Sequence, residues 1–243
     1  MNSVLLLGGT SDMAYSLAKG YLKLNYKVML AGRDLDKLEP IKKDLEVRMN
    51  GQVETLIFDA EDFDSHGQFV SGMRELPQLT VCIFGYLGDQ EVAKNNWAQS
   101  ARIINTNYTG AVSILNLISE RYKQAKSGTI VGISSVAGDR GRESNYIYGS
   151  AKAGFSAYLS GLRSEMFKHG LHVVTVKPGF VRTKMTKDLK LPGPITATPD
   201  QVANAVIKAV RKKKNTIYVL PVWFLIMTVI KSIPEFIFKR LKL

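Results

Sequence analysis

Short apolar runs alternate with longer segments of helical periodicity along most of this chain. Seven runs have the length and composition of buried strands, at residues 4–7, 27–31, 54–58, 79–84, 129–134, 172–177 and 216–220. Strands that are covered on both faces read as continuous apolar runs, and strands interleaved with helices form parallel sheets. The pattern therefore predicts an α/β fold with a doubly wound, seven-stranded parallel sheet.

The segments between these runs predict the helices that would cover the sheet. They extend up to Leu24 and lie at residues 35–47, 62–74, 94–126, 148–168 and 199–213. At 243 residues the chain fits one large domain, and it has no internal repeat or linker. Its one break in composition falls near Lys212. We therefore predict one domain at 1–220, followed by a helical tail at 221–243.

A glycine-rich turn follows the first predicted strand and reads Gly-Gly-Thr-Ser-Asp-Met-Ala (8–14). Such a strand-to-helix turn lets backbone N–H groups and a helix N-terminus approach a pyrophosphate. Asp12 and Ala14 stand where glycines are expected, and a residue that caps or begins a helix explains Asp12 equally well. The position of the turn, after a strand and before a helix, favours a Rossmann-like dinucleotide site. Its predicted cofactor contacts are Gly8, Thr10, Ser11, Asp12 and Met13.

The end of the second predicted strand, Ala-Gly-Arg-Asp (31–34), bears on the choice of dinucleotide. An NAD site places a carboxylate there for the ribose hydroxyls, whereas an NADP site needs a cation for the 2′-phosphate. Arg33 precedes the acid, so we predict NADPH/NADP+ as the cofactor. The alternative is a solvated arginine at the start of a helix.

Tyr148 and Lys152 lie four residues apart in the segment SSVAGDRGRESNYIYGSAK (134–152) and would share one face of a helix. A phenol with a pKa of about 10 is a poor acid–base catalyst at neutral pH. A cation about 4 Å away contributes roughly 4 kcal/mol at an effective dielectric near 20, which is about three pKa units. The pair therefore predicts a tyrosine whose pKa lies near 7, where a general acid works best.

With these features the chain resembles the short-chain dehydrogenase/reductase family over nearly its whole length. Further matches appear in the family's order: Asp59 after the third strand, Asn107 with Gly110, Ser135 thirteen residues before Tyr148, and Pro178-Gly179 followed by Val181 and Thr183. The resemblance implies an NADP(H)-dependent oxidoreductase with a Rossmann-fold catalytic domain. It extends the cofactor-binding set to Asp59, Ala60, Gly85, Tyr148, Lys152, Pro178, Gly179, Val181 and Thr183.

The resemblance also implies a role for each catalytic residue. Tyr148 would protonate a ketone oxygen as NADPH delivers hydride, and Ser135 would hold that oxygen. Lys152 would lower the tyrosine pKa and bind the nicotinamide ribose, while Asn107 would position a water that relays protons. From the residues alone, Ser135 is also explained as a strand-end cap and Asn107 as a helix-kink residue. We expect Ser134 to pack away from the site, and we assign no metal ligands.

Departures from the family's usual pattern resemble one subgroup. They are an acid in the first turn and Phe-Gly-Tyr-Leu-Gly-Asp (84–89) in place of Asn-Asn-Ala-Gly. The same subgroup is matched by Asn-Tyr-Thr (107–109), Tyr-Gly-Ser-x-Lys-Ala-Gly (148–154) and Pro-Gly-x-Val-Arg-Thr-x-Met (178–185). The subgroup reduces a decaprenylphosphoryl-linked 2-keto-pentose (an erythro-pentofuranosid-2-ulose) with NADPH. It implies a keto-sugar on polyprenyl phosphate, used for a cell wall or glycolipid. The alternatives are a soluble ketoreductase of acyl thioesters or steroids, and a non-catalytic dinucleotide sensor.

The last sixth of the chain, which ends in the tail, carries most of the net charge of +12, since residues 205–243 hold nine Lys or Arg and one Glu. Its uncharged stretch, 217–230, is interrupted by Pro221 and falls short of the roughly twenty residues that a bilayer span requires. Beyond Pro234, aromatic and apolar residues mix with Lys and Arg, as in a helix that lies on an anionic membrane. The alternatives are that the tail caps the substrate cleft or packs on a partner subunit.

The remaining expectations concern compartment and partners. Cys82 is the one cysteine and lies in an apolar run, and the N-terminus has no basic leader. We expect a cytoplasmic protein that associates peripherally with the inner face of the cytoplasmic membrane. Nothing resembles a nucleic-acid signature, so we expect no nucleic-acid partner. The family resemblance implies a homodimer or homotetramer.

Overall fold

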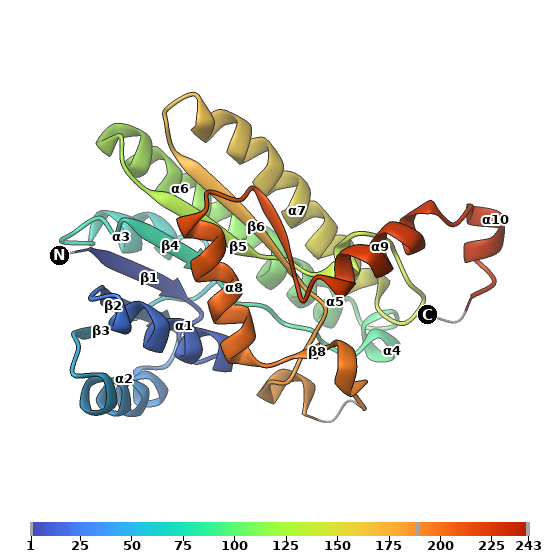
Figure 1. Ribbon diagram of the computed structural model, residues 1–243, viewed down its shortest axis with the longest axis horizontal. Helices are drawn as coiled ribbons and strands as arrows, with labels where there is room; N and C mark the ends of the chain where they lie inside the picture. The colour runs from blue at the N-terminus through green and yellow to red at the C-terminus, as the bar shows by residue number, and fades with distance from the viewer. Residues whose placement is uncertain (1, 188–189, 242–243) are drawn as a thin grey trace.

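The computed structural model describes residues 2–187 and 190–241, and it contains the predicted seven-stranded parallel sheet (Figure 1). The strand order is β3-β2-β1-β4-β5-β6-β9, and every neighbouring pair is parallel. The strands are β1 (Ser3–Leu7), β2 (Lys27–Gly32), β3 (Val53–Ile57), β4 (Leu79–Cys82), β5 (Thr129–Ile133), β6 (His172–Pro178) and β9 (Thr216–Val219). The order reverses between β1 and β4, so a crevice opens at the carboxyl ends of these two strands.

Helices cover both faces of this sheet (Figure 1). One face carries α1 (Asp12–Lys23), α2 (Leu35–Met49) and α8 (Pro199–Arg211); the other carries α3 (Ser65–Ser71), α6 (Gly110–Ala125) and α7 (Tyr146–Phe167). Side chains along β1 alternate between the two apolar layers, with Val4 and Leu6 in the first and Leu5 and Leu7 in the second. All four are fully buried, which explains why the strand reads as one apolar run.

The helices begin where the sequence supplies side-chain acceptors. Ser11 caps α1 and Asp34 caps α2, each accepting a backbone N–H from the first turn. Thr198 begins α8 with a reciprocal capping box, followed by Pro199 at the first helical position.

The helix predicted over residues 94–126 is divided into three parts. After the short α4 (Gln90–Ala93), α5 (Trp97–Ile104) runs into a π-helical turn, Asn105–Thr109, and continues as α6. Gly110 packs so closely on the loop after β3 that an added Cβ would lie 2.0 Å from the Ala60 carbonyl oxygen. The wider π turn and the missing side chain together bring Asn107 inward, where it is buried.

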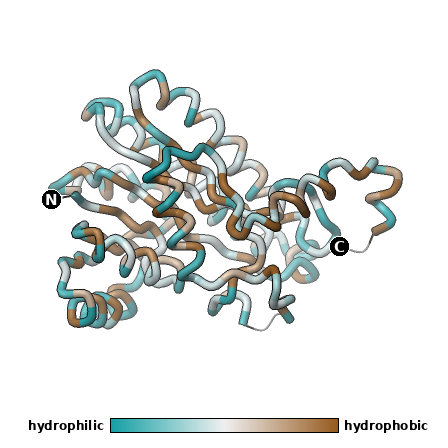
Figure 2. Tube along the Cα trace, viewed as in Figure 1, coloured by the Kyte–Doolittle hydropathy of each residue, from teal (hydrophilic) through white to brown (hydrophobic). Residues whose placement is uncertain are grey.

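Two further features complete the fold, and the first of them lies outside the predicted pattern. A two-stranded parallel sheet pairs β7 (Phe180–Val181) with β8 (Thr196–Ala197) beyond the end of β6. The tail forms α9 (Val222–Ser232) and α10 (Glu235–Phe238), which extend from the carboxyl side of the sheet (Figure 1). Apolar positions continue along α9 and α10 in Figure 2. Across 2–187 and 190–241, none of the helices combines the length and apolarity that a bilayer crossing requires.

Candidate active site

Two adjoining cavities lie at the carboxyl ends of the strands. One, of about 300 Å³, opens beside the glycine-rich turn, and we call it the turn cavity. The other, of about 180 Å³, contains Ser135, Tyr148 and Lys152, and we call it the tyrosine cavity. They share the residues Met13, Ile83, Gly85, Thr183 and Met185. An extended ligand in the first cavity can therefore reach the second.

The turn cavity is shaped by backbone that approaches unusually closely. Gly8 has φ +102°, and a Cβ there would lie 2.7 Å from the Phe84 nitrogen. This position therefore requires glycine. Ser11 accepts the Ala14 N–H at 3.1 Å, which fixes the start of α1 at the cavity wall. The wall includes all five residues predicted at the turn, namely Gly8, Thr10, Ser11, Asp12 and Met13.

Asp12 begins α1 and also holds a distant segment. Its carboxylate accepts the backbone N–H of Lys184 at 2.7 Å, and the Lys184 ammonium lies 3.9 Å away. Lys184 begins the short 3-10 helix Lys184–Thr186, which follows β7. The Asp12 carboxylate is thus directed towards a cation and joins the glycine-rich turn to this segment.

Arg33 and Asp34, the residues at the end of β2 that bear on the choice between NAD and NADP, are placed differently. Arg33 is exposed and lines the turn cavity. The adjacent Asp34 is engaged in capping α2, with its carboxylate 2.6 Å from the Lys37 ammonium. Asp59 and Ala60 line the same cavity. The arrangement leaves a cation, rather than a carboxylate, at the end of β2.

Arg102 is a lining residue of the turn cavity that the sequence did not reveal. Its guanidinium stacks over the Tyr86 ring at 4.4 Å and lies 3.6 Å from the Glu61 carboxylate. The cation comes from α5, more than forty residues after the third strand, so local spacing gives no signal for it.

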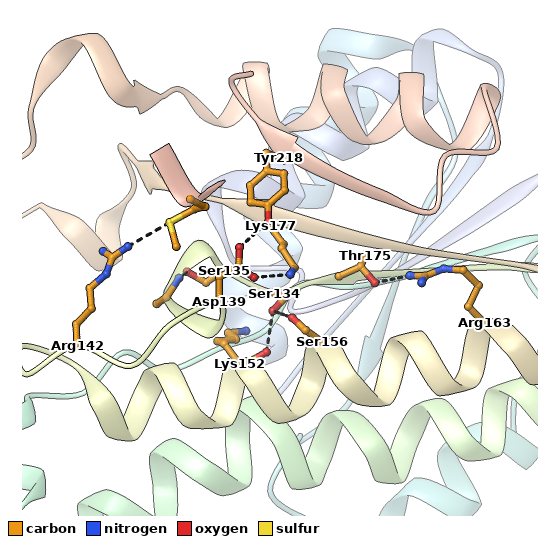
Figure 3. A network of polar contacts seen from close by, with 12 residues as sticks. Ser134, Ser135, Asp139, Arg142, Lys152, Ser156, Arg163, Thr175, Lys177 and Tyr218 are labelled. Carbon is orange, nitrogen blue, oxygen red and sulfur yellow. Dashed lines mark hydrogen bonds and ion pairs between the residues drawn. The ribbon is translucent and has the colours of Figure 1, made fainter. Parts of the chain in front are cut away.

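The tyrosine cavity brings the predicted catalytic side chains together. Tyr148 and Lys152 stand on α7, and Ser135 lies two residues beyond the end of β5. The Lys152 ammonium is buried and donates to the Ile133 carbonyl at 3.1 Å. Ser134 is turned into α7, where its hydroxyl donates to the Lys152 carbonyl at 3.0 Å (Figure 3).

The structure corrects the predicted pKa of Tyr148. Burial raises this pKa to about 12, and a hydrogen bond with Ser135 acts in the opposite direction. The value near 7 expected from the Lys152 charge is therefore wrong. The Lys152 ammonium lies 5.8 Å from the tyrosine ring centroid, and burial lowers its own pKa to about 8. At neutral pH the site thus holds a neutral phenol, a proton donor, beside the Ser135 hydroxyl.

Asn107 lies behind this group rather than in the cavity wall. Its side-chain amide donates to the carbonyls of Tyr86 at 2.6 Å and Ile103 at 2.8 Å. A Cβ added to Gly85 would lie 2.9 Å from Asn107 Oδ1 and 3.5 Å from Lys152 Nζ. Gly85 therefore allows Asn107 and Lys152 to approach each other, and the proposed water relay stays a prediction.

The segment after β6 forms the opposite wall, and the tail packs against it. Pro178, Gly179, Val181 and Thr183 all line the tyrosine cavity. A Cβ on Gly179 would lie 1.9 Å from the Trp223 indole, and Trp223 Nε1 donates to the Ile195 carbonyl at 2.9 Å. Other lining residues that sequence did not identify are Arg142 and Asn145.

Comparisons with known proteins find relatives that span most of this chain. The family model described as "short chain dehydrogenase" matches residues 2–192. An uncharacterized oxidoreductase of Mycobacterium tuberculosis is 34% identical over 243 residues, covering 98% of this chain and 96% of the relative. The ketoacyl reductase HetN of Nostoc sp. is 27% identical, covering 89% and 78%.

A solved structure shows the same fold at lower identity. The short-chain dehydrogenase from Sphingobium yanoikuyae, in complex with NADPH, superposes with a TM-score of 0.83 at 19% identity, over 97% of each chain. The family match and the M. tuberculosis relative each span most of the sequence. This chain therefore belongs to the short-chain dehydrogenase/reductase family of oxidoreductases.

Proposed function

We propose that this protein uses NADPH to reduce a ketone to a secondary alcohol, and that the ketone is a keto-sugar carried on polyprenyl phosphate at a membrane surface. The observation that carries the proposal is the seating of α9. Trp223 and Met227 are buried on its inner side, and Trp223 lines the tyrosine cavity. The same helix leaves Phe224, Leu225 and Val229 between 56% and 65% exposed. One helix thus connects the proposed catalytic group with an apolar outer surface.

The turn cavity supports NADPH as the cofactor. Arg33 stands at the end of β2 with its neighbouring acid turned into a helix cap, as a 2′-phosphate site requires. The similar Sphingobium fold holds NADPH. When bound, NADPH supplies the hydride that adds to the carbonyl carbon and leaves as NADP+.

The residues of the tyrosine cavity would supply the proton that the carbonyl oxygen gains in the reduction. Tyr148, kept neutral by its burial, donates its hydroxyl proton to the carbonyl oxygen, and Ser135 donates a hydrogen bond to the same oxygen. The buried Lys152 ammonium stabilises the tyrosinate that remains. Asn107, next to Lys152, holds the backbone at Tyr86 and would position the water through which the proton is replaced.

The tail supports action at a membrane. Phe236 and Ile237 on α10 are exposed beside Lys239 and Arg240. Such a mixture binds the acyl boundary and anionic headgroups together. The M. tuberculosis relative aligns with 98% of this chain, so its similarity continues into the tail, beyond the family model.

Arg140 holds the tail to the loop that carries the site. Its guanidinium donates to the carbonyls of Ile230 at 2.7 Å and Ile233 at 2.5 Å, and pairs with Glu235 at 2.8 Å. It also stacks on the Phe238 ring at 3.7 Å. Because Arg140 lies between Ser135 and Tyr148 in sequence, a surface that holds the tail also holds the loop of the proposed site.

The cofactor part of the proposal is tested by comparing NADPH with NADH. NADPH should be oxidised far faster, and Arg33→Ala should raise the KM for NADPH by roughly tenfold, since a charged hydrogen bond contributes about 1.5–3 kcal/mol. The KM for NADH should stay unchanged. An equal rise in the KM for NADPH and the KM for NADH would exclude recognition of the 2′-phosphate by Arg33.

The membrane part is tested by co-sedimentation with anionic vesicles. Phe224→Glu with Leu225→Glu should abolish binding, because two charges would enter the apolar surface. The matched control is Val47→Glu with Ile57→Glu, two exposed apolar residues on the opposite end of the sheet order. If the variant with Phe224→Glu and Leu225→Glu still binds the vesicles, the proposal that the apolar surface of α9 contacts the membrane is contradicted.

A second candidate is a soluble ketoreductase of acyl thioesters, which the Nostoc ketoacyl reductase favours. Relative kcat/KM for an acyl thioester and a polyprenyl-phosphate keto-sugar separates the two. We also propose a homodimer or homotetramer, supported by the exposed Trp97 and Phe167 on α5 and α7. Light scattering coupled to gel filtration measures its mass.

A further inference from the structure

Arg142 is a cation in the tyrosine cavity for which the proposed chemistry has no use. It lies on the loop between the 3-10 helix Val136–Gly138 and α7, and it lines the cavity with Ser135 and Tyr148. In Figure 3 its guanidinium extends away from α7 towards a methionine sulfur. This is Met227 of α9, whose Sδ lies 3.3 Å from an Arg142 nitrogen.

The charge of Arg142 lacks a carboxylate partner within residues 2–187 and 190–241. The nearby Asp139 is engaged by the Lys177 ammonium at 2.5 Å and the Tyr218 hydroxyl at 2.6 Å (Figure 3). The thioether of Met227 is only a weak acceptor. Arg142 Nε is buried and has no hydrogen-bond partner in the described part of the chain. Arg142 is partly exposed, but its buried Nε–H donor lacks an acceptor, which is unfavourable, so this position is explained best by a ligand.

Asn145 provides a second polar atom without a hydrogen-bond partner in the wall of the tyrosine cavity. Its Oδ1 is buried and, among the residues that the structure places, has no donor. Asn145 directly precedes α7, and its side chain makes no capping bond there. Much of the remaining wall is apolar, including Leu87, Val136, Phe180 and Trp223. The cavity therefore offers a fork of donors and one acceptor in apolar surroundings.

We propose that Arg142 binds the phosphate group of a hydroxylated ketone, while Asn145 accepts a hydrogen bond from one of its hydroxyl groups. The guanidinium fork suits two phosphate oxygens, and Asn145 suits a sugar hydroxyl. A neutral steroid carries no anionic group to pair with the Arg142 guanidinium. This inference rests on the proposed function and assigns the two residues that would hold the phosphate and a hydroxyl group of its substrate.

Binding of two small ketones tests the assignment without turnover. Dihydroxyacetone phosphate and dihydroxyacetone share the ketone and a hydroxyl, and they differ in the phosphate. Each is titrated into the full chain with saturating NADP+, so that the turn cavity is filled. The chain has two tryptophans, so a Trp97→Phe background leaves Trp223, in the cavity wall, as the reporter of fluorescence.

We expect the phosphate ester to bind roughly tenfold or more tightly than dihydroxyacetone, as a charge-assisted bond would give. Arg142→Gln should remove this preference, Arg142→Lys should keep part of it, and Arg211→Gln on the exposed end of α8 should leave it unchanged. Asn145→Ala should weaken both ketones by a similar factor. Melting curves and NADP+ affinity check the fold, and Arg142→Lys carries the test if Arg142→Gln is unstable.

The outcomes separate this inference from the reductase proposal. No phosphate preference in the parent chain, or a full preference in Arg142→Gln, overturns the role of Arg142 even if ketones are reduced. A preference that depends on Arg142 in a chain that reduces no ketone supports the binding site and refutes the reductase proposal alone.

Discussion

The two cavities of this site are built in different ways. The turn cavity consists mainly of strand ends and the first turn of α1, which are neighbours in the sheet order, and is completed by Arg102 of α5 and by residues 183–185. The wall of the tyrosine cavity also includes the loop before α7 and Trp223 of the tail helix α9. Trp223 packs against Gly179, which lies 44 residues earlier in the sequence. Most of the first cavity can therefore be found from local patterns, whereas more of the second depends on long-range packing. We expect changes in the first to alter cofactor binding and changes in the second to alter substrate selection.

The largest effect should come from Tyr148→Phe, which removes the proposed proton donor and leaves the cavity otherwise intact. We expect turnover to fall by about 10²–10⁴-fold, the usual contribution of a general acid. The affinity for NADP+ should remain within a few-fold of the parent value. Stopped-flow oxidation of NADPH and equilibrium dialysis measure the two quantities. A fully active Tyr148→Phe enzyme would refute the mechanism.

The strand pattern explains where the predicted cofactor residues lie. Each of the residues predicted to bind cofactor lines one of the two cavities, because Gly8, Arg33 and Asp59 follow strands whose apolar runs are plain in the sequence. The pKa of Tyr148 was mispredicted because the spacing to Lys152 gives the partner's position on α7 but not its burial.

The missed residues share a physical reason. Arg142 and Trp223 enter the site through a loop and a tail whose contacts depend on the folded chain, as the bond from Arg142 to Met227 illustrates. The partner of Asp12 lies 172 residues away, so no local motif could show that its charge is satisfied by Lys184. Helical periodicity likewise could not show the π turn at Asn107.

Two glycine substitutions should separate the cavities. Gly8→Ala places a Cβ 2.7 Å from the Phe84 backbone at φ +102°, and Gly179→Ala places one 1.9 Å from the Trp223 indole. Overpacking of this kind destabilises proteins by about 1–3 kcal/mol. Gly8→Ala should chiefly weaken NADPH binding, whereas Gly179→Ala should displace α9 and chiefly raise the KM for the ketone.

The matched control for both is Gly161→Ala on α7, where an added Cβ meets nothing within 4 Å. It should stabilise the protein slightly, by about 0.5–1 kcal/mol, because alanine favours helix. Urea unfolding and cofactor titration give the comparison. If Gly8→Ala and Gly179→Ala alter NADPH binding and the KM for the ketone in the same way, the two cavities do not have separate functions.

Lys152 should make the stability of the tyrosine cavity depend on pH. Burial lowers its pKa to about 8 from the ordinary 10.5, so between these values the unfolded chain binds more protons. The free energy of unfolding should therefore rise with pH across this window, by about 1 kcal/mol between pH 7 and 9 relative to Lys152→Met. Tyr148, with its pKa raised to about 12, opposes this only above about pH 10. Urea unfolding of both proteins at the two pH values measures the difference, and parallel curves would contradict it.

The smallest effect should come from Asp12, which joins the two cavities. Asp12→Ala removes the 2.7 Å bond from the Lys184 N–H, a loss of about 0.5–1.5 kcal/mol, whereas Asp12→Asn keeps an acceptor and loses only the charge. If the bond holds the segment after β7 over both cavities, Asp12→Ala should raise the KM for NADPH and for the ketone by a similar few-fold factor. In Asp12→Asn both KM values should stay close to those of the parent protein. A change in the NADPH constant alone would instead assign Asp12 to the turn cavity, because only a shared wall can alter both constants together.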